Sequence, residues 1–120
     1  MHIPAYDNLN RPIVDIGDAE VPLAYFNIVR LRRAEHFDSC VPGYETCLVP
    51  ARGTIDVKVT ADGGDEHSFE AIGDRPSIWE GDPAAVYVPV GSTAHFVCRS
   101  ESTEVFVAGA RFDEAFEPFA

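Results

Sequence analysis

The sequence predicts an all-β domain, a jelly-roll barrel of about nine short antiparallel strands. The 9 glycines and 9 prolines are spread along the 120 residues and divide the chain into short segments. This punctuation favours many strands over a few long helices. Within several segments apolar and polar residues alternate, as they do along a strand with one buried face. With 46% hydrophobic residues, a chain of this length can fold as one domain around its own core.

The clearest strand is 54–60, where Ile55, Val57 and Val59 alternate with polar residues. A glycine-rich segment follows, and its composition is typical of a hairpin turn. Residues 23–33 form the longest candidate strand, and both of its sides are apolar at first, which is typical of a strand inside two packed layers. The predicted strands are 12–16, 23–33, 45–49, 54–60, 67–72, 77–79, 85–88, 94–99 and 104–108.

Between and beyond these strands the sequence predicts four other segments. Residues 36–44 contain aspartate, serine, proline and glycine and are expected to form a loop. Residues 51–53 are expected to turn the chain. Residues 1–11 have the composition of an N-terminal arm, and 111–120 form an aromatic C-terminal tail. In that tail three aromatic residues stand at helical spacing: Phe112, Phe116 and Phe119.

Two blocks of sequence suggest a more specific architecture. The first, 43–53, is a strand with an inward acid that runs into a glycine turn. The second, 80–91, is a turn, a strand and a Pro-x-Gly corner, and His95 follows it. Two such blocks separated by a hairpin are the layout of a cupin barrel, and the whole chain, 1–120, is then a single cupin domain. Cupin chemistry is usually metal chemistry, so the possible metal ligands decide what such a domain does.

The same blocks carry a resemblance to a known family. Gly43-Tyr-Glu-Thr-Cys-Leu-Val-Pro50 with Gly53, then 72–81 and 85–91, resemble the amino-terminal half of the 5-deoxy-glucuronate isomerase family of inositol catabolism. That family is grouped with 4-deoxy-threo-hexulosonate uronate isomerase from pectin breakdown. The resemblance covers most of 12–110 and implies aldose–ketose isomerisation of a sugar acid by a chain of two cupins. It also implies that the metal ligands, three histidines and a glutamate, lie in the carboxy-terminal cupin, whose motif nothing in this chain matches.

A metal site in this half would need a different set of ligands. The general cupin pattern can be placed on this chain only as His36, Asp38, Glu45 and His95. Two histidines and two carboxylates can bind a divalent metal such as Zn, Mn, Fe or Ni. However, His95 comes one residue late after Gly91, and a slip of one residue turns a strand side chain to the opposite face. We therefore prefer the alternative, in which the chain holds no cofactor and Glu45 is buried against an arginine or a tyrosine.

Other residues could contribute to a site inside the barrel. If the chain acts alone, Glu45 and His95 are the candidate catalytic residues for moving a proton between adjacent carbons. Cys47 shares a strand face with Glu45, so both are expected to face the interior. Arg99 shares the face of His95 and could bind a carboxylate, and Tyr87 is a second candidate for ligand binding.

Composition limits the partners and the compartment. The formal net charge of −11 opposes binding to nucleic acids and to acidic membranes. The three cysteines form no C-x-x-C pair, which indicates free thiols in a reducing compartment. No signal-peptide pattern opens the chain and no apolar stretch approaches the ~18 residues of a membrane span. We expect a cytoplasmic protein.

Three functions remain open. The first is the isomerase, or half of one, acting on a sugar acid or another small molecule. The second is a non-catalytic scaffold or ligand-binding module that acts as a homodimer or pairs with a second cupin. The third is a small metal-dependent cupin of another activity, such as an oxygenase. The fold alone does not choose among them.

Overall fold

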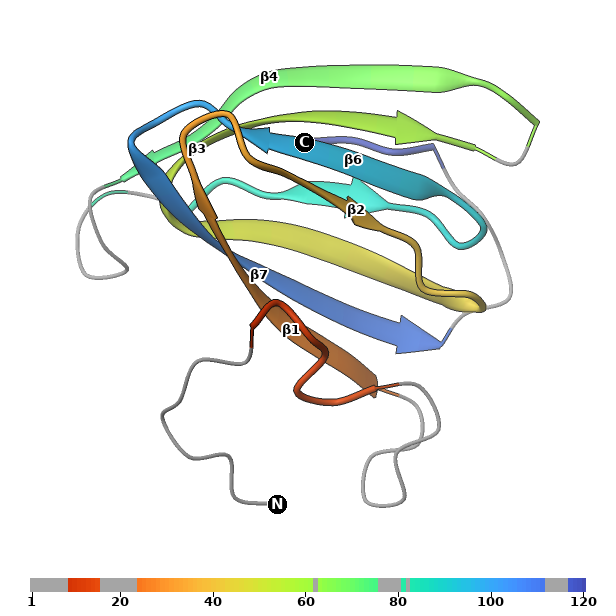
Figure 1. Cartoon of the computed structure of the whole chain (residues 1–120). Coiled ribbons are helices and arrows are strands. Elements are labelled where there is room, and N and C mark those ends of the chain that lie inside the picture. Colours follow the sequence, from red (N-terminus) through yellow and green to blue (C-terminus); the bar gives the residue numbers. More distant parts are fainter. Residues whose placement is uncertain (1–8, 16–23, 62, 76–80, 82, 112–116) are drawn as a thin grey trace.

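The computed structural model describes residues 9–15, 24–61, 63–75, 81, 83–111 and 117–120. Every named element in this part of the chain is a strand (Figure 1), and all the strand pairs are antiparallel. The all-β prediction is confirmed. The strands are β1 (Ala24–Arg32), β2 (His36–Ser39), β3 (Tyr44–Thr60), β4 (Glu66–Arg75), β5 (Val86–Val88), β6 (Thr93–Cys98) and β7 (Ser102–Arg111).

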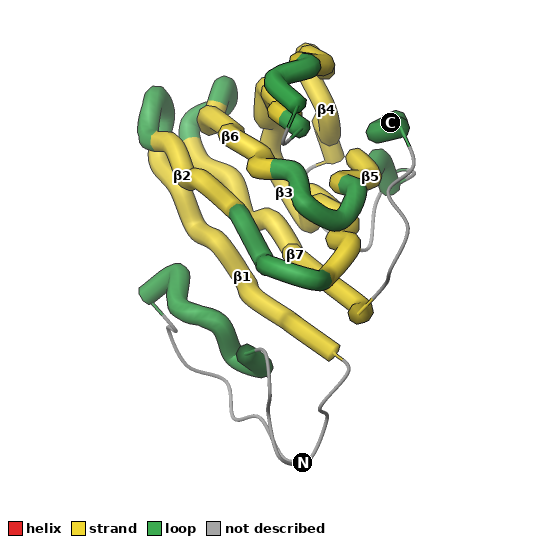
Figure 2. Tube along the Cα trace, turned by 90° about the vertical axis from the view of Figure 1, so that its right-hand side faces the viewer, coloured by secondary structure: helices red, strands yellow, loops and turns green. Residues whose placement is uncertain are grey.

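The strands form one curled sheet that folds into two layers, and β3 belongs to both. The first half of β3 pairs with β7 and β5, and β7 pairs in turn with β1. The second half of β3 pairs with β4 and β6, and β6 pairs with β2. Figure 2 shows the two layers turned toward each other, with β3 between them.

The core fills the space between the layers. Along β1 the inner face consists of Tyr25, Asn27, Val29 and Leu31, which are all buried. Asn27 is fully buried, and its side-chain amide donates to the backbone oxygen of Asn10 at 3.1 Å. The other strands place apolar side chains on the same inner side, among them Leu48, Ile55, Val57, Val59, Val86, Phe96, Val105 and Val107.

The largest difference from the predicted strands concerns 51–53. These residues do not reverse the chain but lie inside β3, which unites the two predicted strands 45–49 and 54–60. The strand bends there because its pairing shifts register between Pro50 and Arg52 and again between Gly53 and Thr54. Gly53 has a φ of +78°, a conformation that a glycine adopts without strain. Residues 51–53 have the composition of a turn, but they form the bend at which β3 passes from one layer to the other.

Three smaller differences bring the number of described strands to seven. Residues 36–39 form β2 instead of a loop, because they pair with β6. The predicted strand 12–16 is reduced to an isolated bridge between Val14 and Phe26. The predicted strand 77–79 lies outside the described residues, as do Phe112 and Phe116 of the tail.

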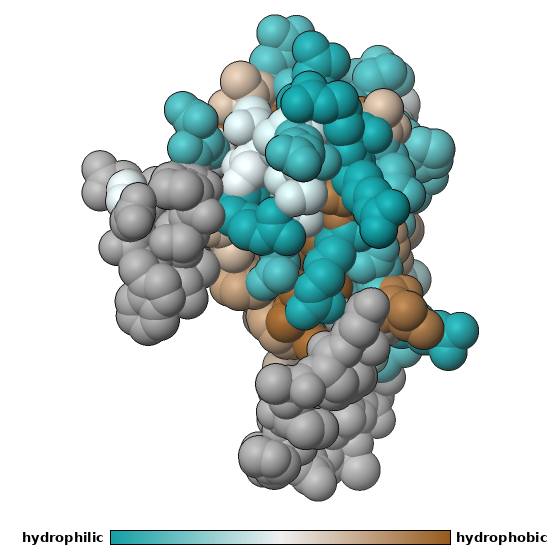
Figure 3. Space-filling model, turned by 60° about the vertical axis from the view of Figure 1, so that its left-hand side comes forward, coloured by the Kyte–Doolittle hydropathy of each residue, from teal (hydrophilic) through white to brown (hydrophobic). Residues whose placement is uncertain are grey.

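Both ends of the described chain contact the sheet. Asn10 accepts a hydrogen bond from the backbone N–H of Arg30 at 2.7 Å, which fixes the end of the predicted arm to β1. Phe119 forms a β-bridge with Tyr87, whose N–H donates to the Phe119 carbonyl at 2.7 Å. On the face shown in Figure 3, hydrophilic residues cover most of the described surface and hydrophobic ones show in small patches. No helix able to cross a bilayer occurs in the described part of the chain.

Candidate functional site

The interior of the barrel is packed with apolar side chains. Val29, Leu48, Phe96, Val105 and Val107 all have 0% of their surface exposed. Such packing leaves neither space nor polar ligands for a substrate among these residues. The expectation that Glu45 and Cys47 face the interior is wrong: the buried positions of β3 are Tyr44, Thr46 and Leu48, so the alternating residues point outward.

Three of the four candidate metal ligands meet on the outer face of β2 and β6. Asp38 and His95 are directly opposed residues of these strands, and the carboxylate Oδ1 of Asp38 contacts Nδ1 of His95. The rings of His36 and His95 lie 5.2 Å apart between centroids. His95 points outward because Ala94 and Phe96 take the inner positions of β6, as its one-residue slip predicts.

Glu45 does not join these three residues. It lies on the half of β3 that pairs with β7 and β5, whereas His36, Asp38 and His95 belong to the other layer. Among the described residues, no group of three or more histidine, cysteine, aspartate or glutamate side chains is arranged to hold a metal ion. The four-residue set therefore does not fit a divalent metal.

Glu45 instead forms a pair with a tyrosine. The Tyr87 hydroxyl donates to Glu45 Oε2 at 2.7 Å, and Tyr87 stacks on Phe119 with ring centroids 5.1 Å apart. Glu45, Tyr87 and Cys47, together with the small residues at the end of β7, line an open depression of about 290 Å³. The interpretation of Glu45 as a carboxylate held by a tyrosine thus agrees with the geometry, although the pair is only half-buried.

This environment keeps two side chains protonated. Burial raises the pKa of Tyr87 to about 12, and the hydrogen bond to Glu45 and the charges nearby act in the same direction. Burial, with the negative charge of Glu45, also raises the pKa of the Cys47 thiol. Because the thiolate is the nucleophilic form, Cys47 is suited to a structural role.

The tyrosine gives a test in alkaline solution. Its folded-state pKa of about 12 exceeds the ordinary 10.0, so unfolded chains lose this proton first. Its contribution to stability is therefore complete below about pH 10 and is lost as the pH rises through about 12. Urea unfolding can be measured below pH 10 and near pH 12. Between these two pH values the free energy of unfolding should fall less in Tyr87→Phe than in the wild type. Equal losses in both proteins would contradict this contribution.

Arg99 does not point into the barrel. Residues 94, 96 and 98 are the buried ones of β6, so Arg99 lies outside, with 62% of its side chain exposed. Its Nε lies 3.2 Å from Asp56 Oδ2 on the adjacent strand β3. The expectation that Arg99 binds a carboxylate within the barrel is therefore wrong, because strand alternation turns it outward.

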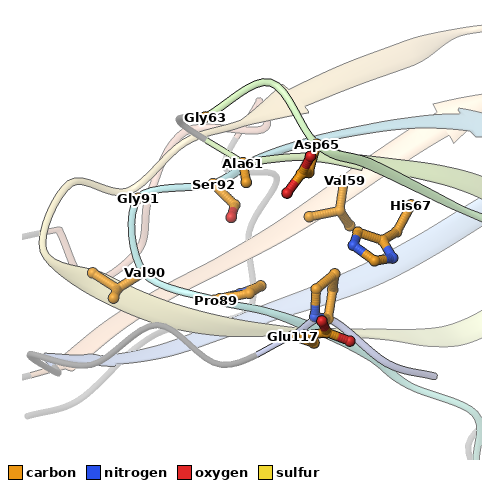
Figure 4. Close-up of a pocket in the computed structure, with 11 residues that line it drawn as sticks. Val59, Ala61, Gly63, Asp65, His67, Pro89, Val90, Gly91, Ser92 and Glu117 are labelled. Carbon is orange, nitrogen blue, oxygen red and sulfur yellow. The ribbon is translucent and has the colours of Figure 1, made fainter.

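A second pocket lies at one end of the barrel, and no pattern in the sequence predicted it. It has a volume of about 330 Å³ and is built from the β3–β4 hairpin, the turn before β6 and the C-terminal segment (Figure 4). We call it the mouth pocket; its polar lining residues are Asp65, His67, Ser92 and Glu117. Only the Pro-x-Gly corner at 89–91 could have drawn attention to it, since the other parts are distant in sequence.

Comparison with known proteins identifies the chain's relatives. The model of the KduI/IolB family matches residues 2–120. The chain belongs to the KduI/IolB family. A curated relative, 5-deoxy-glucuronate isomerase from Shouchella clausii (strain KSM-K16), is 34% identical over 91 residues, which are 73% of this chain and 32% of that protein. The resemblance found in the blocks of β3 and β5 is thereby confirmed.

Solved structures agree with the family and the fold. An IolB-like protein from Salmonella typhimurium LT2 is 28% identical with a TM-score of 0.70, and the match covers 81% of this chain and 35% of that one. The cupin domain of Cnp3 from Schizosaccharomyces pombe is 13% identical with a TM-score of 0.53, covering 76% and 55%. The cupin fold is thus confirmed. This chain spans about a third of the length of its KduI/IolB relatives.

Proposed function

We propose that this domain serves the aldose–ketose isomerisation of a sugar acid as one half of a two-cupin isomerase. The match of residues 2–120 to the KduI/IolB family carries the proposal. The isomerase name of the Shouchella clausii relative indicates the reaction. In the proposed reaction a proton moves between adjacent carbons through an enediolate, which requires a positioned acid or base.

In this proposal the domain supports the reaction and a second cupin supplies the reacting centre. The packed interior around Leu48 and Phe96 favours this division of roles, because substrate would have to displace core side chains. Glu45 and His95 also point away from their common core, on separate halves of the sheet. They therefore diverge and cannot both reach one small substrate.

A domain exchange tests the proposal. We would replace the matching segment of the Shouchella clausii isomerase with this chain and follow conversion of 5-deoxy-glucuronate by NMR. The chimera is expected to be active, whereas the 120-residue chain alone should give only the background rate, with or without added divalent metal. A folded but inactive chimera would overturn the proposal.

Substitutions in the chain distinguish the self-sufficient enzyme from the half enzyme. If the chain alone turned over substrate and Glu45→Gln abolished this turnover, Glu45 would be catalytic and the division of roles would be refuted. In the chimera we expect Glu45→Gln and His95→Ala each to keep turnover within about threefold of the unsubstituted chimera, because neither side chain would lie at the reacting centre that the second cupin supplies. Circular dichroism of each variant checks that the fold survives.

A further inference from the structure

The mouth pocket combines a polar rim with an apolar floor. Val59, whose side chain is buried, lies at its base, and Pro89 and Pro118 add apolar surface. Figure 4 shows Asp65 and Glu117 on opposite sides of the hollow, with His67 at one end. Its volume of about 330 Å³ lies within the range of small-molecule sites, which are mostly apolar with a few convergent polar groups.

Ser92 is the most buried of the polar residues that line the mouth pocket. A turn places it: the Ser92 N–H donates to the Pro89 carbonyl at 3.2 Å, and Gly91 supplies the positive φ of +83°. Ser92 is only 7% exposed, and its hydroxyl points into the hollow (Figure 4). None of the described residues hydrogen-bonds to this hydroxyl. Since no fully buried side-chain nitrogen or oxygen of the described residues lacks a partner, solvent reaches this hydroxyl, and a ligand hydroxyl can take the place of that water.

The β3–β4 hairpin positions the first carboxylate. Its turn is closed by the Ala61 N–H, which donates to the Asp65 carbonyl at 2.8 Å, and by the Gly64 N–H, which donates to the Ala61 carbonyl at 2.9 Å. The second carboxylate, Glu117, belongs to the C-terminal segment that the Tyr87–Phe119 bridge attaches to β5. Both carboxylates are therefore placed by backbone hydrogen bonds of the fold.

This arrangement selects the chemistry of the ligand. Two carboxylates accept hydrogen bonds from hydroxyl groups, while Ser92 and His67 can either donate or accept. Among the described lining residues there is no lysine or arginine, so the rim repels an anion. We propose that the mouth pocket binds a single-ring polyol that carries no negative charge. This goes beyond the proposed isomerisation, because the substrate of that reaction is an acid.

Three sugars of the same ring size but different charge test which ligand the pocket accepts. D-glucose is neutral, D-glucosamine is cationic and D-glucuronate is anionic, and each can be titrated into the 15N-labelled chain. Amide shifts of Gly63, Gly91 and Ser92 report the pocket. We expect D-glucose and D-glucosamine to shift these amides and D-glucuronate to bind at least about tenfold more weakly, which corresponds to one charged interaction. Equal binding of D-glucuronate, or no shift with any sugar, would overturn the proposal.

Variants tie the binding to the named side chains. Ser92→Ala and Asp65→Asn should each weaken D-glucose binding about tenfold, the effect of one charge-assisted or buried hydrogen bond. The matched control Glu101→Gln changes an exposed carboxylate beyond the opposite end of β6 and should leave binding unchanged. The double variant Asp65→Asn/Glu117→Gln should bind D-glucose and D-glucuronate with more similar affinities, because its rim repels the anion less. Unchanged D-glucose binding in Ser92→Ala and Asp65→Asn would refute the site, and the spectra themselves report whether each variant is folded.

Discussion

Replacing Phe96 with alanine is expected to lower the free energy of unfolding by about 3–5 kcal/mol, the usual cost of removing a large buried aromatic side chain. Phe96 is the largest fully buried side chain described, and its ring packs against Phe37 with centroids 5.7 Å apart. The loss combines the transfer of apolar surface with the cavity that remains, because the strands on both sides cannot close over it. Urea denaturation followed by circular dichroism measures the change.

Phe106→Ala is the matched control for this substitution. Phe106 lies on the outer face of β7, half-buried, with its ring 6.0 Å from that of Phe26. Its removal should cost clearly less, since part of the ring already contacts water. If both variants lost the same free energy, the assignment of inner and outer faces would be wrong.

Gly53→Ala is expected to lower the free energy of unfolding by about 2–4 kcal/mol, through backbone strain and a steric clash together. A Cβ atom at this position would collide with the backbone oxygen of Ser102 and would lie 2.7 Å from Ser100 Oγ. The positive φ of +78° adds strain of its own. The neighbouring strand would have to move, and with it the hydrogen bond from Thr54 N–H to Ser100 Oγ.

Substitutions at two other glycines distinguish the effect of backbone strain from that of the steric clash. Gly43 has the same φ of +78°, but a Cβ there meets nothing within 4 Å, so Gly43→Ala should cost about 1 kcal/mol from strain alone. Gly63 has neither a positive φ nor a close neighbour, and Gly63→Ala should change stability by less than about 0.5 kcal/mol. If Gly53→Ala lowered the free energy of unfolding no more than Gly43→Ala, the neighbouring strand would have moved to relieve the clash.

Alternation made the faces of the strands predictable from the sequence. Along the second half of β3, the apolar residues Ile55, Val57 and Val59 alternate with more polar ones, and only burial of the apolar set is favourable. The same alternation predicted that His95 would leave the inner face. Local sequence did not predict β2, because residues 36–39 contain a single apolar residue, Phe37, and a strand this short exists only through its partner β6.

The parts of the candidate sites that escaped prediction depend on contacts between distant segments. The residues Pro50 to Gly53 have the composition of a turn, and only the pairing with β7 and then with β4 keeps them extended. The mouth pocket likewise requires the hairpin at 61–65, the turn at 89–92 and the C-terminal segment to meet. The hydrophobic periodicity of one segment does not predict which distant segments will contact it.

The pairing of β1 with β7 also has a consequence for synthesis on the ribosome. Ala24 is opposite Ala110 and Arg32 is opposite Ser102, so the first strand acquires its only described sheet neighbour from the last. A nascent chain emerges from its N-terminus, and β1 therefore leaves the exit tunnel long before β7 exists. During that interval its apolar inner face and its unpaired backbone are open to other chains. Completion of the domain waits for the synthesis of β7, and a topology with contacts this distant in sequence folds slowly even then.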